Sequence, residues 1–204
     1  MIFWRKFLNN AVKIVIIILI IIILTVSVTF LIKSLSKDIS NSSNSNNTVV
    51  NLKYDELITK YSQEHKVDKA IIYAVIDVES SFRSDVVSKA GAIGLMQIMP
   101  ETFNDMLLKT GENLSENDLF VPDVNIKYGI IYLRYLYDYF NNWDLVIVSY
   151  NAGIGNVKNW IQNPDYYDGN QFLNIPFKET SGYFNKVKSK IEFYDNYFKV
   201  NSNE

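Results

Sequence analysis

The stretch AVIDVESSF, residues 74–82, places a glutamate at the end of the apolar face of a helix. The helix is predicted to begin after Asp68, whose carboxylate is suited to accept hydrogen bonds from the first backbone amides as an N-cap. Apolar residues then recur at helical spacing, so that Glu79 falls on the same buried face. The pattern therefore predicts a helix over residues 69–80 that ends in a buried carboxyl group.

Two effects are expected to raise the pKa of Glu79. Burial disfavours the charged carboxylate, and the carbonyl end of a helix disfavours negative charge because the helix dipole is negative there. A carboxyl group that stays protonated near neutral pH can act as a general acid, whereas a structural carboxylate normally lies in water or beside a cation. Glu79 is therefore the candidate catalytic acid.

Residues 14–32 consist almost entirely of isoleucine, leucine and valine. As a helix they would span roughly 28 Å, about the thickness of a bilayer core, which predicts a single transmembrane anchor. A cleaved secretory signal is the alternative, but the apolar run is longer than that of a typical signal peptide. Three basic residues precede the span and two follow it, which slightly favours a cytoplasmic position for residues 1–13 and an extracytoplasmic domain.

Residues 33–52 are rich in serine and asparagine and lack apolar periodicity, which predicts a flexible tether to a domain over residues 53–204. Residues 1–38 contain five basic residues and one acidic residue, a net charge of +4, so the remainder carries −6 of the overall −2. An acidic domain without a basic run argues against a nucleic-acid ligand. The absence of cysteine suits an exported domain and a cytosolic one equally.

Apolar periodicity and turn residues predict an all-α domain with one irregular insertion. The expected helices span residues 54–65, 69–80, 100–109, 124–140, 145–150, 156–162 and 178–199. Asp144 is expected to cap the short fifth helix, and Gly129 to permit a close helix contact. Residues 88–100 contain two glycines and keep no helical period, so we expect a loop or small hairpin, the kind of segment that often carries the chemistry of a site.

Five stretches, in this order and approximate spacing, resemble the motifs of the soluble lytic transglycosylase family. They are ESSF at 79–82, SKAGAIGLMQIMP at 88–100, NIKYGIIYL at 125–133, SYNAG at 149–153 and IPFKETSGYFNKV at 175–187. The resemblance implies a lysozyme-like fold of the goose type, mainly helical and of the α+β kind. It also implies cleavage of peptidoglycan strands between N-acetylmuramic acid and N-acetylglucosamine.

Glu79 matches the catalytic glutamate of that family. The resemblance implies that it first protonates the glycosidic oxygen and then, as a carboxylate, removes the proton from the C6 hydroxyl of muramic acid, which closes a 1,6-anhydro ring. No water is consumed, and one carboxyl group suffices. Ordinary glycosidases use two. Asp77 points to the other side of the predicted helix and is expected to be a solvated charge, and Asp85 is expected to be a loop residue.

The resemblance implies six further residues that line the substrate groove: Ser88, Gln97, Met99, Tyr150, Asn151 and Glu179. The amides of Gln97 and Asn151 suit the acetamido and hydroxyl groups of amino sugars, because they both donate and accept hydrogen bonds. Tyr150 matches a tyrosine close to the acid, although a tyrosine in a helical core is an equally simple explanation. Glu179 matches a glutamate on the muropeptide side, but its place in a first helical turn is also explained by the helix dipole.

The chain departs from the family pattern in two places, with Arg83-Ser84 after the phenylalanine of the first motif and Ser149 before Tyr150. Neither touches the proposed acid. His65, the only histidine, has no partners at metal-ligand spacing and is expected at the surface of a helix end, so no metal and no cofactor are expected.

Three other functions remain open. A lysozyme-type hydrolase has the same fold but needs an activated water and normally a second carboxylate. A non-catalytic peptidoglycan-binding module would have no use for a buried acid, which is costly to maintain. The domain could also recruit partners within an envelope-spanning secretion or conjugation machine, a function that is compatible with wall cleavage.

Overall fold

The computed structural model describes residues 28–29, 33 and 52–201 of the 204-residue chain. The chain divides into two compact units, Met1–Asn51 and Leu52–Glu204. The second unit is described almost throughout, and the fold and the site below belong to it.

The expected membrane anchor at residues 14–32 lies outside the described residues except for residues 28–29, which are helical. The expected tether at residues 33–52 lies outside them except for its first and last residues. Among the residues that the structure does describe, no helix is long and apolar enough to cross a bilayer.

The second unit is mainly helical. It contains α2 (Asp55–His65), α3 (Lys69–Ser80), α4 (Pro100–Thr110), the 3-10 helix η1 (Glu116–Phe120), α5 (Pro122–Phe140), α6 (Trp143–Ala152), α7 (Ile154–Trp160) and α8 (Lys178–Asn201). Within the described range no strand forms, and the irregular segment at residues 88–100 contains only isolated antiparallel bridges, Ile93 pairing with both Val87 and Ile98. The expected loop or small hairpin is therefore confirmed there.

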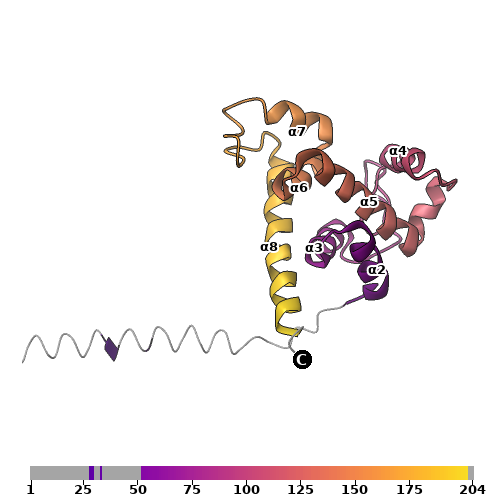
Figure 1. Ribbon diagram of the computed structural model, residues 1–204, viewed down its shortest axis with the longest axis horizontal. Helices are drawn as coiled ribbons and strands as arrows, with labels where there is room; N and C mark the ends of the chain where they lie inside the picture. Colours follow the sequence, from indigo (N-terminus) through magenta and orange to yellow (C-terminus); the bar gives the residue numbers. More distant parts are fainter. Residues whose placement is uncertain (1–27, 30–32, 34–51, 202–204) are drawn as a thin grey trace, which may run out of the picture. The chain divides into compact units, whose positions relative to one another are not determined.

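α3 is the central helix of this unit, because it is apolar on nearly every side. The residues from Ala70 to Ile76 are all buried, and a helix that is hydrophobic all round belongs inside a core. Asp68 caps the helix as expected, since its carboxylate accepts a hydrogen bond of 2.7 Å from the Ala70 amide. The long helix α8 lies alongside α3 (Figure 1), and this is the most extensive helix pairing in the unit.

The predicted start of α6 was wrong. Asn142, not Asp144, is the N-cap, and its side-chain oxygen accepts hydrogen bonds from the amides of Asp144 and Leu145. Asp144 instead lies in the first turn, where the helix dipole favours a carboxylate, and it forms a 2.7 Å ion pair with Lys188 of α8. Sequence could not separate the two residues, because both are good caps and they lie two positions apart.

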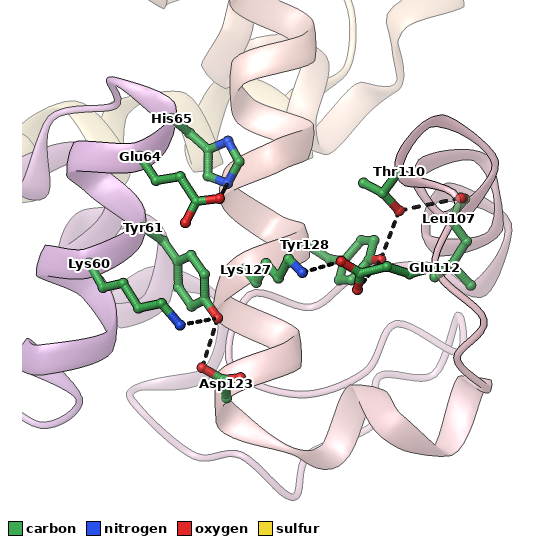
Figure 2. Close-up of polar contacts among 10 residues, drawn as sticks. All are labelled: Lys60, Tyr61, Glu64, His65, Leu107, Thr110, Glu112, Asp123, Lys127 and Tyr128. Carbon is green, nitrogen blue, oxygen red and sulfur yellow. Dashed lines mark hydrogen bonds and ion pairs between the residues drawn. The ribbon is translucent and has the colours of Figure 1, made fainter.

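Polar contacts fasten α2 to α5 and α5 to the end of α4 (Figure 2). The Tyr61 hydroxyl donates to Asp123 at 2.9 Å. The Tyr128 hydroxyl donates to Glu112 at 3.0 Å, and Glu112 also pairs with Lys127. His65 at the end of α2 is half-buried rather than a surface residue, and burial lowers its pKa.

Candidate active site

Glu79 occupies the last turn of α3, and its side chain is partly buried. Burial raises the pKa of Glu79 from 4.5 to about 7, and the Tyr183 hydroxyl lowers it by a smaller amount. The expected upward shift is confirmed. At neutral pH the carboxyl group is therefore divided between its protonated and charged forms, so that it can both give and take a proton.

Two tyrosines from other helices interact electrostatically with this carboxyl group. Tyr150 comes from α6 and Tyr183 from α8, and in both cases burial raises the pKa of the hydroxyl, with a further rise from negative charge on Glu79. Among the described residues the buried Tyr183 hydroxyl has no partner at full hydrogen-bond geometry. Because it still lowers the pKa of Glu79, we place it facing that carboxyl group.

Sequence reasoning assigned Tyr183 only to the apolar stripe of the last helix and missed this position. A signal was present, because a tyrosine on a buried helix face carries a hydroxyl that needs a polar partner. The sequence did not reveal which partner, since Glu79 lies far away along the chain.

The chain turns sharply directly after Glu79 and Ser80. Ser81 and Phe82 both adopt left-handed backbone conformations, with φ of 51° and 62°. Arg83 then donates from its Nε to the Ser80 carbonyl at 3.0 Å, which places a cation at the carbonyl end of α3. The positive charge of Arg83 offsets the negative end of the helix dipole beside Glu79. The raised pKa of Glu79 is therefore attributed to burial and not to the dipole. The departure from the family pattern at Arg83 thus caps α3.

The irregular segment is held against the helices at one residue, Met96. The Met96 amide donates to the side-chain oxygen of Asn125 on α5 at 2.8 Å, and the Met96 carbonyl accepts from the Tyr150 hydroxyl at 2.8 Å. Asn125 is buried and also donates to the carbonyls of Ile93 and Leu119. The Tyr150 hydroxyl therefore binds this segment, and its expected role in substrate binding stays a prediction.

The side chain of Gln97 binds backbone groups in and next to the irregular segment. The residue has a left-handed backbone, with φ of 47°, and its side-chain nitrogen donates to the carbonyls of Gly94 at 2.9 Å and Val86 at 3.2 Å. The amide donors that were expected to serve the substrate are therefore engaged within the protein. Only the side-chain oxygen remains for a ligand, as an acceptor.

Ser88 and Met99 lie at the two ends of the same segment. The Ser88 hydroxyl accepts a hydrogen bond of 3.0 Å from the Ala92 amide, so it too supports the loop. Met99 is the N-cap residue of α4 and is half-buried. Both side chains remain partly exposed, as residues that line a groove must be.

Asn151 forms a hydrogen bond to a neighbouring helix, whereas Glu179 forms none with any residue that the structure describes. Asn151 is exposed at the end of α6, and its side-chain oxygen accepts a 2.7 Å hydrogen bond from the buried Thr180 of α8, which leaves its amide donors for a ligand. Glu179 is exposed in the first turn of α8 and forms no hydrogen bond or ion pair with any residue that the structure describes.

The expectation that Asp77 is a solvated surface charge was wrong. Its carboxylate accepts from the Tyr194 hydroxyl at 2.9 Å and pairs with Lys190 at 2.8 Å, and both partners belong to α8. Asp77 therefore joins α3 to α8. It points away from Glu79, as expected, because a spacing of two residues places side chains on different sides of a helix. Asp85 is exposed in the loop.

Comparison with known proteins agrees with this arrangement. The family model of the transglycosylase SLT domain matches residues 56–173, which include Glu79, the irregular segment and Tyr150. A soluble lytic murein transglycosylase of Salmonella typhimurium is 35% identical over 153 residues, which cover 72% of this chain and 23% of that protein. A membrane-bound lytic murein transglycosylase C of Edwardsiella ictaluri is 34% identical over 116 residues, which cover 52% of this chain and 32% of that protein.

A solved structure is similar as well. The inactive glutamate-to-glutamine mutant of the lytic transglycosylase Slt from Pseudomonas aeruginosa matches with a TM-score of 0.67 at 30% identity, over 80% of this chain and 27% of that one. The match thus extends over about a quarter to a third of the length of these relatives. The matched motifs, the fold and the buried glutamate agree, and the chain belongs to the transglycosylase SLT domain family.

Proposed function

We propose that this chain is a membrane-anchored lytic transglycosylase. It cleaves the β-1,4 bond between N-acetylmuramic acid and N-acetylglucosamine in peptidoglycan and leaves 1,6-anhydromuramic acid ends. The single observation that carries the proposal is the buried carboxyl group of Glu79, whose pKa burial raises to about 7. The family of the chain and the names of its relatives support the same activity.

In the proposed reaction Glu79 acts first as an acid and then as a base. Its proton passes to the glycosidic oxygen as the bond from that oxygen to C1 of muramic acid breaks. The resulting carboxylate accepts the proton of the C6 hydroxyl, whose oxygen bonds to C1 and closes the anhydro ring. The proton count balances without water. A pKa near 7 suits a group that works in both directions at neutral pH.

The surrounding residues orient this group and shield it. Tyr150 and Tyr183 shield one side of the carboxyl group from water, and the Tyr183 hydroxyl is positioned to donate to the carboxylate once the proton has left. The exposed Asn151 amide offers donors, and the Gln97 side-chain oxygen an acceptor, to the acetamido and hydroxyl groups of the sugars.

A hydrolase of the lysozyme type is the second candidate, and the surroundings of Asp77 count against it. Such an enzyme needs a second carboxylate to activate water or to form a covalent intermediate. Asp77, two residues from the acid, is bound to Lys190 and Tyr194 of α8. A non-catalytic binding module is a weaker candidate still, because it gains nothing from a buried carboxyl group, which is costly to maintain.

To test the proposal, the full-length chain is purified in detergent and incubated with peptidoglycan. The molecular masses of the released muropeptides are then measured by mass spectrometry. Anhydro ends are expected, and Glu79→Gln is expected to lower the rate by at least about 1,000-fold, in the upper part of the range for a lost general acid. Glu192→Gln, at an exposed glutamate of α8, is the matched control and should retain the wild-type rate. Products one water heavier would identify a hydrolase instead.

We also propose that residues 14–32 hold the enzyme in the cell membrane, with the domain facing the wall and residues 33–52 limiting its reach. The apolar run in the sequence supports this, as does the membrane-bound relative. Within an envelope-spanning secretion or conjugation machine, such an anchor would confine wall cleavage to the position of its partner proteins.

A further inference from the structure

The turn that follows α3 has a strained backbone. Ser81 and Phe82 both have positive φ angles, 51° and 62°. A bulky residue such as phenylalanine rarely adopts this conformation, because its Cβ atom then crowds the backbone. Strained conformations of this kind persist only where neighbouring groups hold them. The turn at residues 81–83, which we call the α3 turn, therefore depends on the contacts that fix it.

Contacts with α3 itself supply part of this support. The backbone amide and the Nε of Arg83 both donate to the Ser80 carbonyl, at 3.2 and 3.0 Å. The Phe82 ring packs against the ring of Tyr73, with centroids 5.9 Å apart. These partners belong to α3, so they fasten the turn to its own helix and not to another part of the domain.

A further contact of the α3 turn comes from a distant part of the sequence. The Lys53 ammonium donates to the Phe82 carbonyl at 3.3 Å. Lys53 is the second residue of the compact unit Leu52–Glu204 and directly follows the proposed tether at residues 33–52. Its hydrogen bond therefore connects the place where the chain enters the domain to the turn that ends the helix of Glu79.

The backbone around Lys53 is itself fixed against α3. Tyr54 has a left-handed backbone, with φ of 67°, and the Lys53 ammonium lies 4.8 Å from the centre of its ring. Asp55 then accepts hydrogen bonds from Lys69 at 2.7 Å and from the Tyr73 hydroxyl at 2.8 Å, and both donors belong to α3. The Lys53 side chain thus extends from an anchored backbone, so that it can hold the α3 turn in place.

We propose that Lys53 is a positioning residue for the cleavage reaction. By binding the Phe82 carbonyl it holds the α3 turn, and with it the last turn of α3, in the orientation that aims Glu79 at the glycosidic oxygen. A small displacement of an acid from the bond that it protonates lowers the rate steeply. The inference rests on the proposed function, because Glu79 is the proposed acid.

The test replaces Lys53 in the full-length chain and measures the cleavage of soluble glycan strands. Lys53→Met keeps the apolar stem of the side chain but removes the donor. It is expected to lower kcat at least threefold, which corresponds to about 0.7 kcal/mol. KM is expected to stay unchanged, because the proposed groove residues lie on other segments. Lys53→Arg keeps a cationic donor and should restore at least half of the wild-type kcat.

Two further measurements separate positioning from other effects. Lys53 is exposed, so thermal unfolding of Lys53→Met should follow that of the wild type. Burial and the Tyr183 hydroxyl are the causes that set the pKa of Glu79, so the dependence of kcat on pH should keep its shape. A variant that is slower at every pH by the same factor has lost orientation and not acidity.

Lys66→Met is the matched control, because Lys66 is an exposed lysine that follows α2 and lies outside the α3 turn. It should keep the wild-type kcat and KM. An unchanged kcat in Lys53→Met, a loss that Lys53→Arg does not reverse, or a shifted pH profile would overturn the inference and leave the proposed function intact. Absence of cleavage by the wild type would overturn the proposed function, and the inference with it.

Discussion

Glu79 and Asp77 lie two residues apart on α3, and their surroundings give them different roles. Asp77 meets an ammonium group and a hydroxyl from α8, which stabilise its charged form. Glu79 interacts with the hydroxyls of Tyr150 and Tyr183 instead, and burial raises its pKa to about 7. The same side-chain chemistry thus yields a link between helices at one position and the proposed proton donor at the other.

The raised pKa of Glu79 predicts a stability cost at high pH. The unfolded carboxyl group loses its proton near pH 4.5 and the folded one near pH 7, so the folded state binds more protons between these values. Stability from this group therefore falls as the pH rises from about 4.5 to 7 and stays low above it. After allowance for solvent screening of a partly exposed group, the cost is about 2 kcal/mol.

Glu79→Gln is expected to remove that cost. Denaturant unfolding at pH 5 should give similar free energies for wild type and variant, whereas at pH 8 the variant should be more stable by about 2 kcal/mol. Glu192→Gln, at an exposed position, should follow the wild type at both values. An equal gain for Glu79→Gln at pH 5 and pH 8 would contradict the assigned pKa.

At the scale of elements, the irregular segment at residues 88–100 takes its shape from α5 and α6. Asn125 binds the backbone amide of Met96 and Tyr150 binds its carbonyl, and the Met96 side chain lies directly over Gly129. A Cβ atom at Gly129 would stand 2.3 Å from the Met96 sulfur. The close contact expected at Gly129 therefore exists, but its partner is this segment and not a helix.

Gly129→Ala is expected to destabilise the fold by about 1–3 kcal/mol, the usual cost of overpacking, and to lower the cleavage rate because the segment must move away from α5. Gly182→Ala on α8 is the matched control, since nothing lies within 4 Å of its added Cβ. The control should gain about 0.5–1 kcal/mol from higher helix propensity. Thermal unfolding and muropeptide release measure both effects, and a stabilised Gly129→Ala would refute the contact.

At the scale of the whole molecule, one domain of this family follows an apolar N-terminal segment. The match extends over about a quarter of the length of the soluble relative, and the domain holds all seven sequence-predicted site residues. The proposed anchor and tether would therefore determine where a small catalytic unit acts.

The anchor predicts a distribution that fractionation of cells can measure. The full-length chain should sediment with membranes, resist washing with carbonate and enter solution with detergent, because about 19 apolar residues bury a bilayer-spanning surface. A variant that lacks residues 2–33 should be recovered in the soluble fraction. Recovery of the full-length chain without detergent would count against an uncleaved anchor.

The sequence by itself determined the local features of this protein. The capped helix at Lys69–Ser80 and the irregular segment follow from residue types and short-range spacing, and they agree with the structure. The position of Glu79 on a buried face follows from helical periodicity. These features depend on interactions between residues a few positions apart, which a sequence displays directly.

Only the tertiary structure decided which distant groups meet. It placed Tyr183 against Glu79, bound Asp77 to α8 and turned the donors of Gln97 inward. Local interactions do not decide these positions. A tyrosine on an apolar stripe can equally pack in the core or present its hydroxyl to a polar group, and an aspartate on a helix can equally face solvent or bind another helix. The choice between them comes from packing between helices that lie far apart in the sequence.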